Sequence, residues 1–288
     1  MPFVQTDRGR FFYAEYSTLG PVVYLLHGLT AKSQDWGGIP DVLAKTGFHV
    51  FVFDMRGHGQ SDGSTSSPQA NPAFGYTPED HGKDIAAWTE ALGQSKIHVV
   101  GHSTGGRNAL VFAGLFPEKT ISLTVIDQTL NPDPDSWRKY MGRYLEFPTP
   151  FMDEPQLDKF LEKKFPKDLK RQVYYKGQFW KNDLGQWDWN YSTEAAWKTQ
   201  KHGREKDAHD LLSKVRCRML FMKGGDSRYV PPEEAELIRS LIPDGELVVV
   251  PDAEHAIFRD NPEGFLRVLV PFLISQSQGY SFKPVEKA

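Results

Sequence analysis

The 288-residue sequence predicts an α/β fold with a mostly parallel, doubly wound sheet. Short apolar and β-branched runs alternate with stretches whose apolar residues recur at helical spacing, and this alternation is typical of parallel strands joined by crossover helices. Glycine turns follow several of the apolar runs, as at His27-Gly28. One long stretch without this alternation divides the chain into a core and an insertion.

The chain before residue 131 carries most of the predicted core. Thr77-Pro78-Glu79-Asp80 favours a helix start, because it combines a threonine cap, a proline at the first helical position and acids near the positive end of the helix dipole. The strands predicted here cover residues 11–16, 22–26, 49–54, 97–100 and 121–126, and the helices cover residues 39–45, 77–92 and 107–116.

The stretch from residue 131 to 213 shows no obvious strand pattern. It holds five of the seven tryptophans, namely Trp137, Trp180, Trp187, Trp189 and Trp197. Long insertions with their own helices are usually functional lids. We therefore expect a core domain formed by residues 1–130 and 214–288, with residues 131–213 inserted as a helical cap. The alternation resumes with strands at 218–222 and 246–250 and helices at 232–241 and 262–275.

Composition excludes several classes of protein. A net charge of −3 gives no basic surface for nucleic acid. The single cysteine, Cys217, cannot form an internal disulfide, and its apolar setting predicts a packed thiol. No apolar run reaches the roughly 18 residues of a membrane span, and residues 1–7 do not resemble a secretion signal. We expect a soluble, cytoplasmic protein; no feature of the sequence specifies an oligomeric state.

A serine between glycines is the strongest chemical signal in the chain. A strand that turns sharply into a helix places the residue at the turn in strained geometry, and small neighbours leave room for it. The strand predicted at 97–100 precedes this segment and the helix at 107–116 follows it, so Ser103 is placed as a nucleophile. The segment reads Gly101-His102-Ser103-Thr104-Gly105-Gly106.

A serine hydroxyl needs a base to accept its proton during attack. Among the nine histidines, His255 is the best candidate, because it follows the predicted strand 246–250 through a short loop, at the sheet edge where sites of open α/β folds gather. We interpret His27, His58 and His102 as framework residues that bond nearby backbone. No pair of histidines has convincing metal-ligand spacing, so no metal site is expected.

Four motifs follow one another along the chain: His27-Gly28, Asp54-Met55-Arg56-Gly57-His58-Gly59-Gln60-Ser61, Gly101–Gly106 and Ala253-Glu254-His255. Together they resemble the α/β-hydrolase fold family, and the resemblance covers nearly all of the chain outside the insertion. It is to a serine esterase or thioesterase branch with a helical cap, and it implies an oxyanion hole formed by the backbone N–H groups of Leu29 and Thr104. It also places Asp35 and Trp36 near the same loop, where either both line the pocket or Trp36 packs beneath the cap.

The acid that orients His255 has two candidates. Many relatives place it in the loop after the strand that follows the cap, where Asp226 lies; counting back from Val230-Pro231, however, the family's usual position falls on Ser227. A branch that this sequence resembles uses the end of the preceding strand instead, which here is Asp127. We favour Asp127 and keep Asp226 as the alternative.

The resulting hypothesis is a cofactor-free serine hydrolase that cleaves a small to medium carboxylic ester through an acyl-enzyme, with Ser103, His255 and Asp127 as the triad. Cap aromatics favour an apolar or aromatic small-molecule substrate, or they form only the core of the cap. Thioesterase, lactonase, amidase, carbon-carbon bond hydrolase and cofactor-free dioxygenase activities share the scaffold. A ligand receptor that retains the triad is the non-enzyme alternative.

Overall fold

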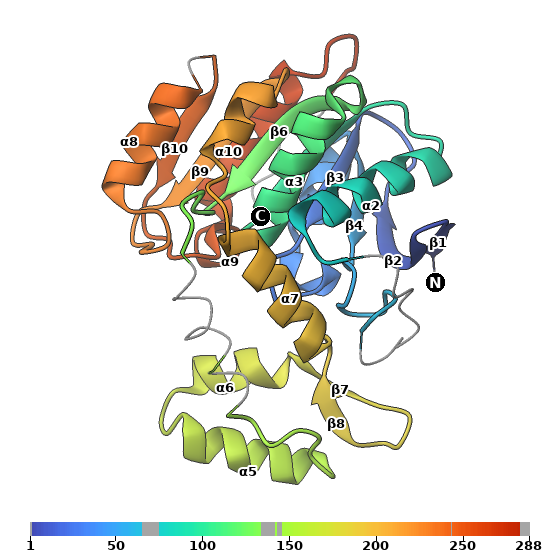
Figure 1. The fold of residues 1–288 in the computed structure, drawn as a ribbon, viewed down its shortest axis with the longest axis vertical. Coiled ribbons are helices and arrows are strands. Elements are labelled where there is room, and N and C mark those ends of the chain that lie inside the picture. The colour runs from blue at the N-terminus through green and yellow to red at the C-terminus, as the bar shows by residue number, and fades with distance from the viewer. Residues whose placement is uncertain (1, 65–74, 134–141, 143–145, 243, 283–288) are drawn as a thin grey trace.

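The computed structural model describes residues 2–64, 75–133, 142, 146–242 and 244–282, and its core is an eight-stranded sheet (Figure 1). The strand order is β1-β2-β4-β3-β5-β6-β9-β10, and every pair from β4 to β10 is parallel. The mostly parallel sheet predicted from the sequence is therefore confirmed. The strands are β1 (Phe3–Thr6), β2 (Gly9–Tyr16), β3 (Val22–Leu26), β4 (His49–Phe53), β5 (Ile97–His102), β6 (Thr120–Ile126), β9 (Arg218–Gly224) and β10 (Glu246–Val250).

Helices cover both faces of the sheet, as a doubly wound fold requires. On one face, Trp88 of α2 stacks on Phe53 of β4 with ring centroids 4.1 Å apart. On the other face, Trp36 stacks on Phe258 at 4.4 Å, so Trp36 belongs to the core beside α9 and α10. The first face carries α2 (Pro78–Ala91), α3 (Thr104–Leu115) and α8 (Pro232–Leu241); the second carries α1 (Ile39–Thr46), α9 (Ile257–Asp260) and α10 (Pro262–Ser275).

Most of the segment between β6 and β9 lies to one side of the sheet, and α7 is the nearest to the core of its described α-helices (Figure 1). Its short hairpin, β7 and β8, corrects the expectation that no strand occurs there. Each strand has only three residues, too few for an alternating pattern to be visible, and Gly185 with φ 76° forms part of the connection. The elements are α5 (Glu154–Lys164), α6 (Leu169–Lys176), β7 (Phe179–Lys181), β8 (Trp187–Trp189) and α7 (Thr193–Arg204).

This segment has an aromatic core of its own. Phe179 stacks on Trp189 at 4.1 Å, and Trp189 packs in turn against Tyr191 at 5.3 Å. Leu29, from the loop after β3, is part of the same buried cluster. At least Trp189 therefore stabilises the segment itself, while Trp137 lies outside the described residues. In the described part of the chain, no helix combines the length and apolarity needed to cross a bilayer.

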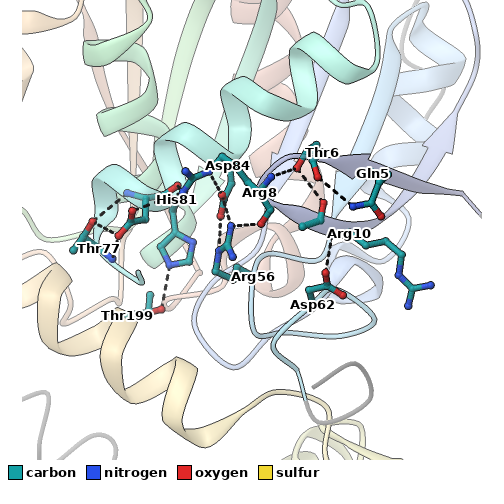
Figure 2. A network of polar contacts seen from close by, with 12 residues as sticks. Gln5, Thr6, Arg8, Arg10, Arg56, Asp62, Thr77, His81, Asp84 and Thr199 are labelled. Atoms are coloured by element: carbon teal, nitrogen blue, oxygen red, sulfur yellow. Dashed lines mark hydrogen bonds and ion pairs between the residues drawn. The ribbon is translucent and has the colours of Figure 1, made fainter. Parts of the chain in front are cut away.

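A buried ion network joins three distant parts of the chain (Figure 2). Asp84 of α2 accepts hydrogen bonds from the Nε atoms of Arg8 and Arg56 at 2.6 and 2.8 Å. Arg56 and Asp84 are each 1% exposed. On the same helix, His81 Nε2 lies 3.1 Å from the Thr199 hydroxyl of α7. The network therefore ties the loop after β4 to α2, and His81 ties α2 to α7.

Candidate active site

Ser103 lies at the turn between β5 and α3 with φ 52° and ψ −124°. A non-glycine residue in this region is strained and persists only where its surroundings hold it. Three backbone bonds do so: the Ser103 N–H donates to Ile126 O at 2.8 Å, and Ser103 O accepts from the N–H groups of Gly106 and Arg107 at 2.8 and 3.1 Å. The side chain is thus presented at the carboxyl end of a central strand, as predicted.

The glycines around Ser103 allow backbone segments to approach one another closely. A Cβ atom on Gly101 would lie 2.2 Å from Gly105 O. A Cβ atom on Gly105 would lie 2.5 Å from the carbonyl oxygens of both Leu26 and His27. Non-bonded atoms do not approach this closely, so a side chain at either position would clash with the backbone. The two glycines therefore allow the loop after β3 to pack directly on the turn at Ser103.

His255 and Asp127 meet at the same sheet edge. His255 lies in the loop between β10 and α9, and its Nδ1 is 2.7 Å from Asp127 Oδ2. Asp127 directly follows β6, has φ 46° and is fully buried. Its carboxylate also accepts from the Gly224 N–H at 3.1 Å and from the Ser227 hydroxyl. Three donors thus satisfy a buried carboxylate and fix its orientation.

The alternative acid, Asp226, lies elsewhere. Its side chain is exposed, and its backbone N–H donates to Ala253 O at 3.0 Å. The neighbouring Ser227, at the position where many relatives carry the acid, directs its hydroxyl to Asp127. In this geometry the carboxylate that contacts His255 belongs to Asp127.

His102 connects Ser103 to His255. The His102 ring lies 4.6 Å from the His255 ring, and its Nε2 donates to the His255 carbonyl at 2.9 Å. Burial, followed by the nearby His255, holds the pKa of His102 well below its usual range. A neutral His102 therefore supports the His255 loop beside Ser103 without adding a charge to the site.

The expected oxyanion hole consists of the backbone N–H groups of Leu29 and Thr104, and both backbone segments lie next to Ser103. A Cβ atom on Gly28 would lie 3.4 Å from the Ser103 Cβ, so the backbone that leads into Leu29 passes directly beside the serine. Thr104 is the first residue of α3, where N–H groups lack helical partners and the helix dipole is positive. Within the described residues, neither the Leu29 nor the Thr104 N–H donates a hydrogen bond. Two unused donors thus flank Ser103.

His27 and His58 support this loop through backbone contacts, as framework residues do. His27 Nδ1 donates to Gly28 O at 2.7 Å, and its Nε2 accepts from the Met55 N–H at 2.9 Å. His58 Nε2 accepts from the Thr30 N–H at 3.2 Å. Burial lowers the pKa of His27 to about 4 and that of His58 to about 3. Both rings are neutral at pH 7, which leaves each with one donor and one acceptor.

Lys32 is a site neighbour that sequence reasoning missed. Its side chain is 9% exposed, and its Nζ donates to Gly177 O and lies 5.6 Å from the centre of the Trp180 ring. Asp35 Oδ1 is 4.0 Å away, and burial lowers the pKa of Lys32. A lone lysine in a loop gives no sequence signal for such a role. Its contacts tie the loop carrying Leu29 to the segment between β6 and β9.

A strained serine on a strand-to-helix turn, beside a histidine held by a buried aspartate, defines the class of protein. The family model for the alpha/beta hydrolase fold matches residues 21–262. The chain belongs to this family, and it is a hydrolase by its fold and by its relatives.

Two curated relatives and one solved structure illustrate the similarity. The chain is 25% identical over 254 residues to 2-(acetamidomethylene)succinate hydrolase of Mesorhizobium japonicum, covering 88% of each chain. It is 25% identical over 296 residues to the bifunctional esterase/perhydrolase DCH of Acinetobacter calcoaceticus, covering 96% of this chain and 100% of that protein. A crystal structure of E-2-(acetamidomethylene)succinate hydrolase superimposes with a TM-score of 0.80 at 25% identity, covering 95% and 98% of the two chains.

Proposed function

We propose that the protein hydrolyses carboxylic esters of small to medium size through an acyl-enzyme on Ser103. The observation that carries this proposal is the 2.7 Å contact of His255 with buried Asp127, held beside the strained turn at Ser103. The esterase activity in the name of the DCH relative, which this chain matches over its whole length, supports the same assignment.

In the proposed mechanism, His255 Nε2 accepts the Ser103 proton as the hydroxyl attacks the ester carbonyl. Asp127 fixes the imidazole so that Nδ1 carries the other proton, and it stabilises the imidazolium that forms. The Leu29 and Thr104 amides receive the oxyanion, and each preset donor is worth about 3 kcal/mol of barrier. His255 then protonates the leaving alcohol, and water attacks the acyl-enzyme in the same way.

We propose further that residues 131–213 act as the cap over this site. Lys32 bonds Gly177, and Leu29 belongs to the buried aromatic cluster of the segment, so the oxyanion loop and the segment share contacts. The cap aromatics favour a substrate whose acyl or alcohol group is apolar or aromatic, because they offer a large contact area and few groups that need hydrogen bonds.

The direct test is labelling with a fluorophosphonate probe, followed by a panel of chromogenic esters from acetyl to decanoyl. We expect labelling and turnover in the native chain and neither in Ser103→Ala. Absence of labelling in the native chain contradicts the nucleophile assignment. Labelling without turnover on any acyl donor contradicts the esterase and favours a ligand receptor.

An amide substrate is the second candidate, because one relative that matches by both sequence and structure is named for a substrate with an acetamido group. Amide and ester hydrolysis share the acyl-enzyme and differ in the leaving group that His255 must protonate. Matched N-acyl and O-acyl p-nitrophenyl substrates separate the two: a higher kcat/KM on the anilide than on the ester overturns the ester assignment.

A further inference from the structure

One hydroxyl connects the acid of the site to an aromatic ring beyond it. Ser227 Oγ donates to Asp127 Oδ2, the oxygen that also faces His255, and accepts from the Tyr229 N–H at 3.2 Å. A hydroxyl donates one hydrogen bond and accepts others, so this side chain serves both neighbours at once.

The Tyr229 ring lies flat against His255. The two ring centroids are 3.7 Å apart and the planes meet at 18°. Tyr229 is 38% exposed, so burial of its own apolar surface does not by itself account for the place of the ring against His255. An aromatic face attracts cationic groups, and the imidazole becomes cationic while it holds the serine proton.

The backbone of this loop has hydrogen bonds of its own, besides the one from the Tyr229 N–H to the Ser227 hydroxyl. Its backbone is held by the Ser227 N–H to Gly224 O at 3.1 Å, by Gly225 to Val250 at 2.8 Å, and by Asp226 to Ala253 at 3.0 Å. All three bonds run from backbone to backbone. These bonds hold the loop without using the Ser227 hydroxyl or the Tyr229 ring, the two groups that contact the Asp127–His255 pair.

We propose that Ser227 and Tyr229 are positioning residues that act as a unit: Ser227 orients the acid, and Tyr229 holds the plane of the base. This inference rests on the proposed roles of Asp127 and His255. Removing the Ser227 donor concentrates the carboxylate charge on the imidazolium, which favours the protonated base. Removing the Tyr229 ring face disfavours the protonated base. The two losses therefore act on His255 in opposite directions.

The experiment compares Ser227→Ala with Ser227→Thr, and Tyr229→Leu with Tyr229→Phe, using Arg228→Ala in the same loop as the matched control. With an ester that the native enzyme cleaves, we expect Ser227→Ala and Tyr229→Leu to lower kcat about 10- to 100-fold at nearly constant KM. The acidic limb of the kcat/KM profile should move to higher pH in Ser227→Ala and to lower pH in Tyr229→Leu. Ser227→Thr, Tyr229→Phe and Arg228→Ala should stay within about threefold of the native enzyme.

Equal losses without opposite movement of the limb, or native kcat in Ser227→Ala, overturn the proposal. Proton NMR of the His255 Nδ1–H resonance needs no substrate and separates this failure from failure of the esterase assignment. Faster exchange of that proton in Ser227→Ala than in Arg228→Ala supports positioning even where no ester is cleaved. Equal exchange in the two variants contradicts it.

Discussion

His255 Nδ1 lies 2.7 Å from Asp127 Oδ2, although the two residues are 128 positions apart in the chain. β6 and β10 are not adjacent in the sheet, because β9 lies between them. The contact therefore depends on the loop after β10 crossing the end of β9, where the Gly224 N–H also bonds Asp127. The acid, the base and the strand between them form one connected arrangement.

Replacing the acid tests the arrangement most directly. Asp127→Asn should lower kcat about 10⁴-fold, because an amide holds the wrong imidazole tautomer. Asp226→Asn, whose side chain is exposed, should leave kcat nearly unchanged. Steady-state kinetics on a cleaved ester check both variants, and a loss confined to Asp226→Asn would show that the acid is misassigned.

The packing at Gly105 predicts a loss of stability. Gly105→Ala would place a Cβ atom 2.5 Å from two backbone carbonyls, so β3 and the turn at Ser103 must separate. We expect a destabilisation of about 1 to 3 kcal/mol or more, together with lost activity. Gly38→Ala is the control, because nothing lies within 4 Å of its added Cβ and its φ of −81° suits any residue. Urea unfolding measures both, and equal effects contradict the packing argument.

The ion network of Figure 2 predicts a contrast between buried and exposed pairs. Asp84→Asn leaves Arg56, which is 1% exposed, without its counter-charge, and it should cost about 3 to 5 kcal/mol. Glu263→Gln breaks the exposed pair with Arg267 and should cost less than about 1 kcal/mol. Urea unfolding measures the loss of free energy of unfolding in each variant. Similar losses in the two variants would contradict the argument that the buried pair contributes more than the exposed one.

The buried His98 predicts a dependence of stability on pH. Its ring lies between the hydroxyls of Ser122 and Ser277, and burial lowers its pKa from 6.5 to about 4. The unfolded chain therefore binds the proton first, so the stability contributed by the neutral ring is complete above pH 6.5 and declines as pH falls toward 4. The loss amounts to about 1.4 kcal/mol per pH unit for each such histidine.

His98→Gln retains a donor and an acceptor but cannot take up the proton. We expect the free energy of unfolding of this variant to fall less steeply between pH 6.5 and 4 than that of the native chain, by about 1.4 kcal/mol per pH unit. Urea titrations at four pH values measure the slopes, and parallel slopes would show that His98 is not buried neutral.

Features that depend on local sequence were predictable. The turn at Ser103 is specified by glycines and by the strand and helix that flank it, and the structure shows the strained backbone that this pattern implies. The sheet followed from alternating apolar runs, although β1, a four-residue edge strand, and the hairpin of β7 and β8 were too short to show a period.

Features that depend on long-range contacts were not predictable in the same way. The sequence around Asp127 and Asp226 allowed either residue to be the acid, because sequence alone does not show which of the two carboxylates faces His255. The contacts of Lys32 with Gly177 and of Ser227 with Asp127 were not predicted, since these partners lie 145 and 100 positions away. The placement of Trp36 in the core likewise follows from α9 and α10 packing on the sheet.

The left-handed backbone at Ser103 and Asp127 has a consequence for evolution. These two residues, with φ 52° and 46°, stand at the ends of the adjacent strands β5 and β6, where glycine would adopt the same backbone without strain. Ser103→Gly should therefore be inactive yet at least as stable as the native chain. Selection for thermal stability alone would drive position 103 away from serine, so its retention in a lineage would record continued demand for the reaction.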